Sequence, residues 1–403
     1  MKQEERVQKA ALAGIRVLDL SRLVAGNMAT LQLADFGADV IKIEQPGTGD
    51  PLRQWRKSNL DLWWREYGRN KRSLSLNLKS PRGRAILLKL VAQSDVLVEN
   101  FIPGKLIEIG LSYDILLETN PKLVILSITA WGHDGPYRDK PGFGTLVEAM
   151  SGFASMLGFA DRPPTLPPIP IADMITGLYG ALACMMALRH RDATGAGQVI
   201  DLSLLEAMYS VLGPVAAEYE RTGKFPKRNG NRSPNSAPRN SYKTLDDKWI
   251  ALSASTPLMA EKLFKSVGLE DVLQDERFST NEARVRNGDE TDTIVANAIR
   301  KFTLSDLMAL FDETGVAGAP IYDVPQFVED PHVKERGILI EVNDPKLGSY
   351  RMHAPLPRFS SSPGAIRFPG ARLGQHNQEI LSSLLNLEEA DINELQAAGV
   401  IGS

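Results

Sequence analysis

Short apolar runs alternate with helical segments along the first third of the chain, and this alternation constrains the fold more than any other feature. Helices are expected at 26–37 and 80–93. The runs with strand character are 15–20, 39–44, 95–99 and 122–128. Apolar strands separated by helices indicate a parallel sheet covered on both faces. We therefore predict an α/β fold whose ligand binds beyond the carboxyl ends of the strands.

The turn after the first of these strands lacks the glycines that hold a dinucleotide. It runs from Ser21 to Asn27 and contains Gly26 as its single glycine, whereas the dinucleotide fingerprint needs three. No Walker-type phosphate loop occurs in the sequence. The five histidines stand singly rather than in ligand pairs, and a serine elbow of the hydrolase type is missing. These features argue against a nicotinamide enzyme, a metal site and a serine hydrolase.

A proline-rich stretch followed by a long apolar helix marks the candidate catalytic position. The prolines between Pro163 and Pro170 prevent a helix there, and 174–189 has the Ala, Leu and Met content of a buried helix. Asp173 therefore falls at or near the N-cap, where a carboxylate accepts hydrogen bonds from free amides and interacts with the helix dipole. From position alone an ordinary cap is the commoner interpretation. Its place at the start of a buried helix favours a functional one.

The composition is that of a globular protein with a weakly acidic charge. Apolar residues make up 43% of the chain, charged residues 24%, and the net charge is -3. Nucleic acid and anionic membranes are therefore not expected as partners. The charged N-terminus and the lack of an apolar run of about 18 residues predict a cytoplasmic protein. The single cysteine, Cys184, is expected to be a packed thiol.

A basic and aromatic stretch between Arg53 and Arg72 leaves three interpretations open. One is nucleic acid, and a commoner one for an isolated patch is a solvated face or a subunit contact. The third is an anionic ligand with several phosphates, held by arginines and helix ends.

Nine short motifs occur in a characteristic order along nearly the whole chain. They are Val17–Ser21, Gly37–Glu44, Asn70–Ser73, Asp95–Phe101, Pro103-Gly104, Ala149–Gly152, Ala172-Asp173, Thr194–Gln198 and Leu373–His376. Through them the chain resembles the class III coenzyme A transferases, the formyl-CoA transferase and carnitine CoA-transferase family.

The resemblance implies an enzyme that moves CoA from an acyl-CoA to a free carboxylic acid. Asp173 matches the family's nucleophile, which forms a mixed anhydride and then an aspartyl-CoA thioester; a carboxylate needs no separate base for this at neutral pH. A helix N-terminus is expected to keep it ionised. CoA acts as a substrate, and no permanently bound cofactor is implied. The CoA contacts carried over are Val24, Ala25, Leu76, Asn77, Leu78, Lys79, Asn100 and Phe101.

The resemblance also implies the architecture. A large domain with a Rossmann-like parallel sheet is expected from both chain ends, 1–220 and 326–403. From its polar, turn-rich composition the segment 221–240 is expected to be a linker. It leads to a smaller α+β domain at 241–325, which opens with a hairpin between Lys243 and Ser253. Family members form interlocked homodimers, in which each chain threads through the other.

Several positions depart from the formyl-CoA branch and shift the expected substrate. Val24 replaces a glutamine, Gln45 replaces an arginine, and Glu108 stands where some members carry a basic residue. The segment Ser253–Pro257 has none of the glycines of that branch's glycine-rich loop. A dicarboxylic or medium-sized organic acid is therefore expected rather than formate or oxalate. The basic residues expected to meet a substrate carboxylate are Arg228, Arg232 and Arg239.

Two alternatives remain. An α-methylacyl-CoA racemase shares the fold but needs a histidine after a Pro-Gly pair and an acid after that; here Pro141-Gly142 is followed by Phe143 and Gly144. Phenylalanine carries no proton, so this alternative lacks its base. A non-catalytic CoA-binding subunit is the second alternative, and it would tolerate any residue at position 173.

Overall fold

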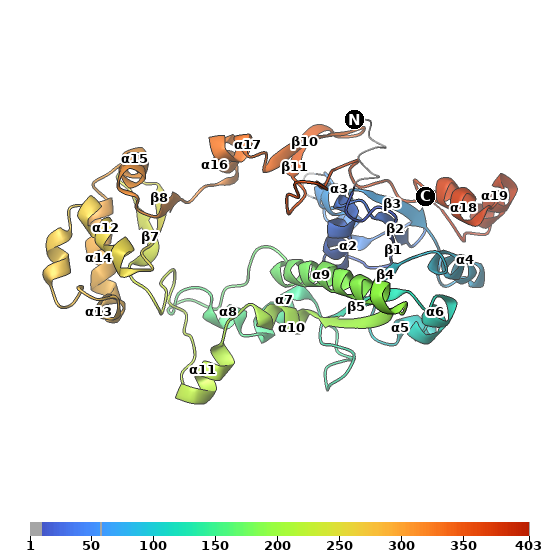
Figure 1. Cartoon of the computed structure of the whole chain (residues 1–403), viewed down its shortest axis with the longest axis horizontal. Coiled ribbons are helices and arrows are strands. Elements are labelled where there is room, and N and C mark those ends of the chain that lie inside the picture. The colour runs from blue at the N-terminus through green and yellow to red at the C-terminus, as the bar shows by residue number, and fades with distance from the viewer. Residues whose placement is uncertain (1–9, 57–58, 403) are drawn as a thin grey trace. The chain divides into compact units, whose positions relative to one another are not determined.

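The computed structural model describes residues 10–56 and 59–402 (Figure 1). These residues form two compact units. The first comprises the described chain as far as Gly152, together with Pro167–Gly213 and the chain from Arg336 onward. The second comprises Phe153–Leu166 and Pro214–Glu335.

A six-stranded sheet forms the centre of the first unit, with the order β3-β2-β1-β4-β5-β6 and only parallel neighbours. Its strands are β1 (Arg16–Asp19), β2 (Asp39–Glu44), β3 (Lys71–Ser75), β4 (Val96–Glu99), β5 (Val124–Thr129) and β6 (Gln198–Ser203). The predicted parallel sheet is confirmed. The sequence pattern did not predict β3 as a strand, because Lys-Arg-Ser-Leu-Ser is polar.

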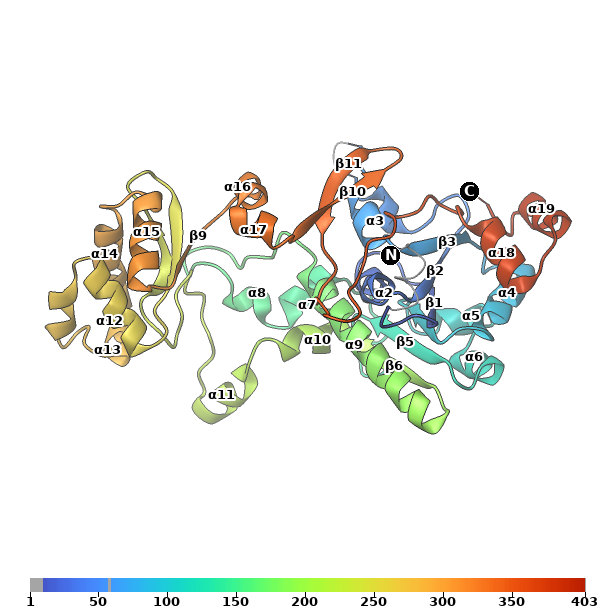
Figure 2. The ribbon, with the colours of Figure 1, turned by 45° about the horizontal axis from the view of Figure 1, so that its top comes forward.

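Two long helices, α2 (Ala25–Asp35) and α9 (Ile171–Thr194), pack against each other beside the sheet. They approach closely at Gly177, where an added Cβ would lie 2.5 Å from the Cβ of Met28. On the other side, strand residues such as Leu18 and Ile41 share a core with helices from both ends of the chain (Figure 2). These helices are α4 (Pro81–Val91), α6 (Tyr113–Thr119), α18 (Asn377–Leu385) and α19 (Glu389–Ala397).

Shorter elements complete the first unit. They are η1 (Pro51–Gln54), α3 (Leu62–Tyr67), α5 (Lys105–Glu108), α7 (Gly144–Met150), α10 (Leu204–Ser210), and the antiparallel pair β10 (Leu339–Asp344) and β11 (Gly348–His353). Helix α9 is longer than expected, since it begins at Ile171 with Pro170 as its N-cap. By length and hydropathy alone it could cross a membrane, but its glycines Gly177 and Gly180 pack it closely against α2 and β5.

The second unit is built on a three-stranded antiparallel sheet, β7 (Arg239–Lys243), β8 (Trp249–Ser253) and β9 (Gly318–Pro320). The expected hairpin is confirmed, and Asp247 in its turn has a φ of 60°. Its helices are α8 (Phe153–Met156), α11 (Val215–Thr222), α12 (Pro257–Ser266), η2 (Glu270–Gln274), α13 (Asn281–Arg286), α14 (Gly288–Ile299), α15 (Leu304–Thr314), α16 (Val324–Glu329) and α17 (Pro331–Glu335).

The polar segment 221–240 belongs to this second unit and is tied to it by specific bonds. Arg232 forms ion pairs with Asp289 and Asp292, and the buried Arg284 donates from Nε to the carbonyl of Ala237 at 2.7 Å. The later part of the segment, from Arg232 onward, is therefore held against α13 and α14.

Candidate functional site

A cavity of about 730 Å³ lies at the carboxyl edge of the sheet, where a parallel α/β sheet places its ligand. Its walls come from the segments that follow the first four strands. They are Leu20–Arg22 after β1, the 43–51 segment and Gln54 after β2, Leu76, Leu78 and Lys79 after β3, and Phe101, Ile102, Lys105 and Ile109 after β4. The strand order reverses between β1 and β4, so this cavity stands at the topological switch point.

Among the described residues, three cationic side chains line this cavity, namely Arg22, Lys79 and Lys105, and all three are exposed. The Arg22 guanidinium lies over the Phe101 ring, 5.3 Å from its centroid. Lys105 also pairs with Glu108. The remaining wall is mostly apolar, so the cavity combines a surface for an aromatic or aliphatic group with cations for an anionic one.

The residues that the sequence assigned to CoA lie either in this cavity or directly behind it. Leu76, Leu78, Lys79 and Phe101 line it. Asn100 supports it instead, since its side chain accepts from the Arg22 amide and donates to the Arg22 carbonyl, both at 2.8 Å.

Asn77, Val24 and Ala25 also support the site rather than line the cavity wall. The side-chain oxygen of Asn77 accepts from the Lys79 amide at 3.1 Å. Val24 and Ala25 are 1% exposed, so their side chains face the core and only their backbone is placed to act.

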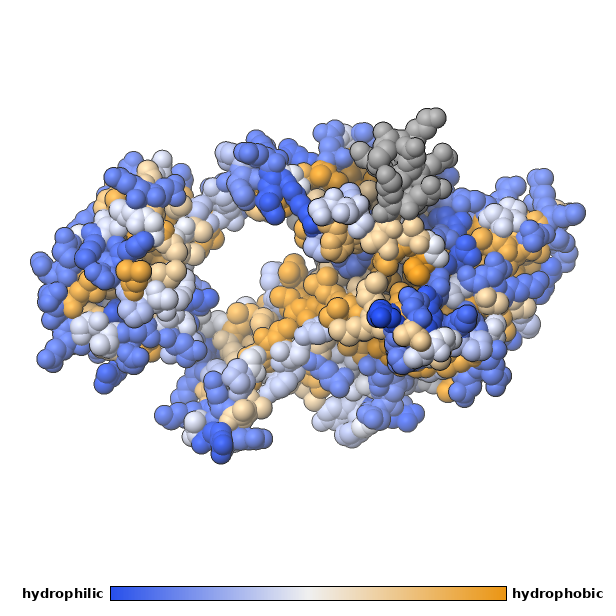
Figure 3. All heavy atoms as spheres, viewed as in Figure 1, coloured by the Kyte–Doolittle hydropathy of each residue, from blue (hydrophilic) through white to orange (hydrophobic). Residues whose placement is uncertain are grey.

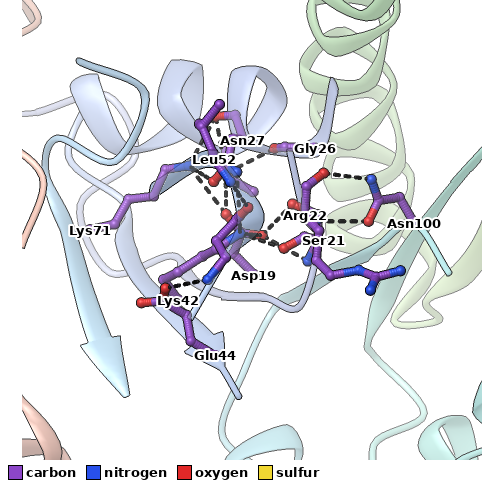
Figure 4. Close-up of polar contacts among 12 residues, drawn as sticks. Asp19, Ser21, Arg22, Gly26, Asn27, Lys42, Glu44, Leu52, Lys71 and Asn100 are labelled. Carbon is purple, nitrogen blue, oxygen red and sulfur yellow. Dashed lines mark hydrogen bonds and ion pairs between the residues drawn. The ribbon is translucent and has the colours of Figure 1, made fainter. Parts of the chain in front are cut away.

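The loop that joins the cavity to α2 is anchored by a buried polar network (Figure 4). Leu23 has a φ of 62°, a strained value for leucine, and its amide donates to Asp50 Oδ1 at 2.9 Å. Asn27 donates to the Leu23 carbonyl at 2.6 Å and to Asp50 Oδ2 at 2.7 Å. The loop therefore has one conformation, which fixes the first amides of α2.

Buried charges beneath the loop reinforce this network. Lys42 contacts Asp19 at 3.1 Å and Asp50 at 3.0 Å, and Lys71 contacts Asp19 at 3.2 Å. Burial alone would raise the pKa of Asp19, but the two lysines lower it to about 2. Burial lowers the pKa of Lys71 to about 8. The polar sequence of β3 is thus explained, because its lysine neutralises an aspartate at the end of β1.

Asp173 is the third residue of α9, and the backbone amide of Ala25 donates to its carboxylate. Burial, and then the negative charge of Glu148, raise its pKa to about 6. The helix N-terminus was expected to keep Asp173 ionised; burial acts against it and outweighs the amides, so the pKa lies above that of an exposed aspartate. At pH 7 the carboxylate is still mostly ionised, but it is a stronger base than an exposed aspartate.

The nucleophile candidate and the cavity are connected by a short piece of chain. Arg22 lines the cavity and Ala25 contacts Asp173, and three residue steps span at most about 11 Å. A ligand with a long flexible arm can therefore place its head group in the cavity and its reactive end at Asp173.

Helix α7 forms the other boundary of this site. A Cβ added to Gly144 would lie 2.1 Å from Asp173 Oδ2, so this glycine leaves room for the carboxylate. One turn later Glu148, which is 1% exposed, accepts from the Ala172 amide at 3.1 Å. Glu148 was not predicted from the sequence. Its spacing could have indicated it, because residues four apart in a helix lie on the same face, and Gly144 and Glu148 both face α9.

The three arginines proposed for a substrate carboxylate lie in the second unit. Arg232 is held by Asp289 and Asp292, and the half-buried Arg228 donates to the Phe159 carbonyl at 3.2 Å. Arg239 donates to the Asn231 carbonyl at 2.7 Å and lines a separate, open cavity of that unit. Arg239 is thus the best placed of the three to meet a ligand.

The groups that a racemase would need are replaced or engaged elsewhere. Phe143 is 62% exposed and has no basic atom, and Gly144 provides only space. The nearby His133 bonds through Nε2 to Ser127 Oγ at 2.6 Å. Within the part of the chain that the structure describes, no group of three or more His, Cys, Asp or Glu side chains could hold a metal ion.

Comparisons with known proteins agree with this geometry. The family model described as CoA-transferase family III matches residues 12–377. The succinyl-CoA–D-citramalate CoA-transferase of Chloroflexus aurantiacus is 40% identical over 97% of this chain and 98% of its own length. Succinyl-CoA:glutarate CoA-transferase of Mus musculus is 34% identical over 97% of this chain and 90% of its own.

A solved structure shows the same fold. The crystal structure of a CaiB/BaiF family protein from Brucella suis has a TM-score of 0.83 and 33% identity, and the match covers 94% of this chain and all of that one. Because the family model and these relatives span nearly the whole chain, including the switch-point cavity and Asp173, the chain belongs to CoA-transferase family III and is a class III CoA-transferase.

Proposed function

We propose that this enzyme transfers CoA from a dicarboxylyl-CoA, of which succinyl-CoA is the simplest, to a second dicarboxylic acid. Asp173 is the nucleophile. The observation that carries the proposal is the buried carboxylate of Asp173, with a pKa of about 6, bonded to one amide at the start of α2. Such a carboxylate is ionised without a separate base and is more nucleophilic than an exposed one.

The reaction divides into anhydride and thioester steps. An oxygen of Asp173 attacks the thioester carbon, the C–S bond breaks, and CoA leaves as a thiolate from a mixed anhydride. The thiolate attacks the Asp173 carbonyl, which releases the donor acid and leaves an aspartyl-CoA thioester. The acceptor carboxylate then attacks this thioester, and the freed thiolate takes the acceptor acyl group, which restores the Asp173 carboxylate. The Ala25 amide, fixed by the Leu23 turn, stabilises charge on the carbonyl oxygen of Asp173 in these steps.

Two lines of support favour dicarboxylic substrates. The relatives described above are named for citramalate and glutarate, with succinyl-CoA as the donor. The chain also lacks the glutamine and glycine-rich loop of the formyl-CoA branch, having Val24 and Ser253–Pro257 instead.

The test is to incubate the protein with a panel of acyl-CoAs and free acids and to follow new thioesters by mass spectrometry. We expect exchange between succinyl-CoA and four- or five-carbon dicarboxylic acids, and a CoA adduct on the peptide that contains Asp173. Exchange restricted to monocarboxylic acids would overturn the substrate class, and an adduct on another residue would overturn the nucleophile.

We expect the cationic side chains of the cavity to bind the CoA phosphates equally well in the enzyme–substrate complex and in the transition state. Reversal of the charge in Lys79→Glu is expected to raise KM for acyl-CoA about tenfold with little change in kcat. Lys89→Glu, an exposed change on α4 outside the cavity, is the matched control and should leave KM unchanged. Steady-state kinetics at two salt concentrations measure both, and an unchanged KM in Lys79→Glu would place the phosphates elsewhere.

We further propose that the chain forms an interlocked homodimer. A stripe of apolar side chains runs along α9 at one face, with Leu178 49%, Leu182 50% and Met186 63% exposed. Figure 3 shows apolar surface in this region, over α7, α9 and α10. An uncharged helical stripe of this kind is typical of a buried subunit contact, and a second copy of the chain is its proposed partner.

Leu182→Glu is expected to dissociate the dimer, because it would bury a charge at the centre of this stripe. Light scattering coupled to size-exclusion chromatography measures the mass of each variant. Ile107→Glu, at an exposed isoleucine on α5, is the control and should remain dimeric. A wild-type chain that elutes as a monomer at micromolar concentration would contradict the proposal.

A further inference from the structure

Helix α9 begins without a capping side chain of its own, and this leaves a role for another residue. Its N-cap is Pro170, which has no side-chain acceptor, although the first amides of a helix need partners. Glu148, from α7, accepts from the amide of Ala172, the second residue of α9, at 3.1 Å. The cap of α9 is therefore supplied from a different helix.

This arrangement separates two tasks that a single aspartate would otherwise perform. If Asp173 capped α9, its oxygens would be held by the helix amides and its basicity would fall. With Glu148 on the Ala172 amide, the Asp173 carboxylate meets the Ala25 amide, its own amide and the space above Gly144. Asp173 therefore takes its own amide, while the Ala172 amide of the same first turn is taken by Glu148.

The elements packed around Asp173 show which charged group acts on its carboxylate. Glu148 is the charged group that acts on Asp173 from α7, while α2 contributes the uncharged Ala25 amide. Met174, the next residue of α9, packs against a cluster of Val24, Leu52 and Trp64, beside which lies Tyr67. Burial raises the pKa of Tyr67 to about 12, so it stays neutral across the working range. Of the described residues, Glu148 therefore provides the negative charge that acts on the nucleophile.

We propose that Glu148 is a positioning residue that takes the Ala172 amide of α9 and keeps the nucleophile basic. As Asp173 attacks the thioester, its negative charge moves to the thioester oxygen and sulfur. The fixed carboxylate of Glu148 repels the negative charge more strongly while that charge is on Asp173 than after it has moved to the thioester. The ground state is therefore raised more than the transition state, and the activation barrier falls. This inference rests on the proposed role of Asp173 as nucleophile.

The test is the pH dependence of kcat/KM, whose acid limb reports the ionisation of the nucleophile in the free enzyme. Glu148→Gln keeps an oxygen for the Ala172 amide and removes the charge. Its acid limb is expected to move down by about one pH unit, and its plateau rate to fall several-fold. Glu148→Asp keeps the charge but shortens the side chain, so its acid limb should move less while its melting temperature falls by about 3 °C as the cap weakens.

Glu206→Gln provides the matched control. Glu206 is an exposed glutamate in the first turn of α10, a helix that also packs against α9. Its loss should leave the acid limb unchanged. An acid limb that stays in place in Glu148→Gln would overturn the inference while leaving Asp173 as the nucleophile. If Glu148→Gln does not fold, Glu148→Ala removes the same charge, and the position of its acid limb decides the question in the same way.

The proposed function has a separate outcome in the same experiment. Wild-type enzyme incubated with acyl-CoA should yield the adduct at Asp173, whatever the Glu148 variants do. Full activity without such an adduct would overturn the nucleophile itself rather than the role of Glu148.

Discussion

Asp173→Asn is expected to abolish CoA transfer and to make the protein more stable above pH 6. The activity loss is expected to be on the order of 10⁴-fold or more, because the substitution removes the atom that bonds to the acyl carbon. Binding of acyl-CoA should be nearly unchanged, since the cavity lining lies after β1 to β4 and does not include Asp173. Steady-state exchange and isothermal titration with a non-reactive CoA analogue measure the two quantities.

The gain in stability follows from the direction of the pKa shift. The pKa of Asp173 is raised from 3.8 to about 6 in the folded protein, first by burial and then by Glu148. The folded state therefore binds a proton more tightly than the unfolded chain, and ionisation of Asp173 costs stability as pH rises through this interval. Above pH 6 the full penalty of about 3 kcal/mol applies, and below about pH 4 it disappears.

Asparagine carries no such penalty. We expect the melting temperature of Asp173→Asn to exceed that of the wild type by about 5 °C at pH 8 and to match it near pH 4. Asp192→Asn, on the exposed last turn of the same helix, is the control and should keep both activity and stability, because the Asp192 side chain is 61% exposed and Arg191 keeps its pair with Asp95. A stability gain in Asp173→Asn that is independent of pH would show that packing rather than charge is responsible.

The sequence could predict those strands whose apolar composition matches the buried position that they occupy. The apolar runs at β1, β2, β4 and β5 are buried on both faces, which is why their composition alone identified a parallel sheet. β3 was missed because Lys71 is buried by pairing with Asp19, a partner more than fifty residues away in the chain. In the sequence alone, a charged residue indicates an exposed position. Only the contact with Asp19 in the folded structure shows that Lys71 is buried.

The same limit applies to the site. Asp173 was singled out because the helix that it begins is too apolar for a surface, and the motif order then matched it to the nucleophile of the family that the chain resembles. The spacing of Glu148 from Gly144 is a weak local signal, since the role of Glu148 depends on where α7 packs against α9. The split between lining residues such as Phe101 and supporting ones such as Asn100 also appears only in three dimensions.

Gly144→Ala tests the geometry of the nucleophile with the smallest possible change. Gly144 is the first residue of α7, and its backbone conformation is open to any residue. The added methyl group would lie 2.1 Å from Asp173 Oδ2 and 3.2 Å from its Cγ. Either the carboxylate rotates away from the Ala25 amide or α7 shifts, and both displace the attacking oxygen by about an ångström. Such a displacement is expected to lower kcat about 100-fold.

Gly288→Ala is the matched control, because Gly288 is the first residue of α14 and has its nearest neighbour, Arg232, 3.8 Å from the position of the added carbon. Both substitutions favour the helix slightly, so a difference between them reports the space at Asp173 rather than helix propensity. We expect Gly288→Ala to retain wild-type kcat and both variants to bind acyl-CoA normally. Wild-type kcat in Gly144→Ala would mean that the attacking oxygen is not the one facing α7, and the nucleophile would then react from its other face, toward the amide of Ala25.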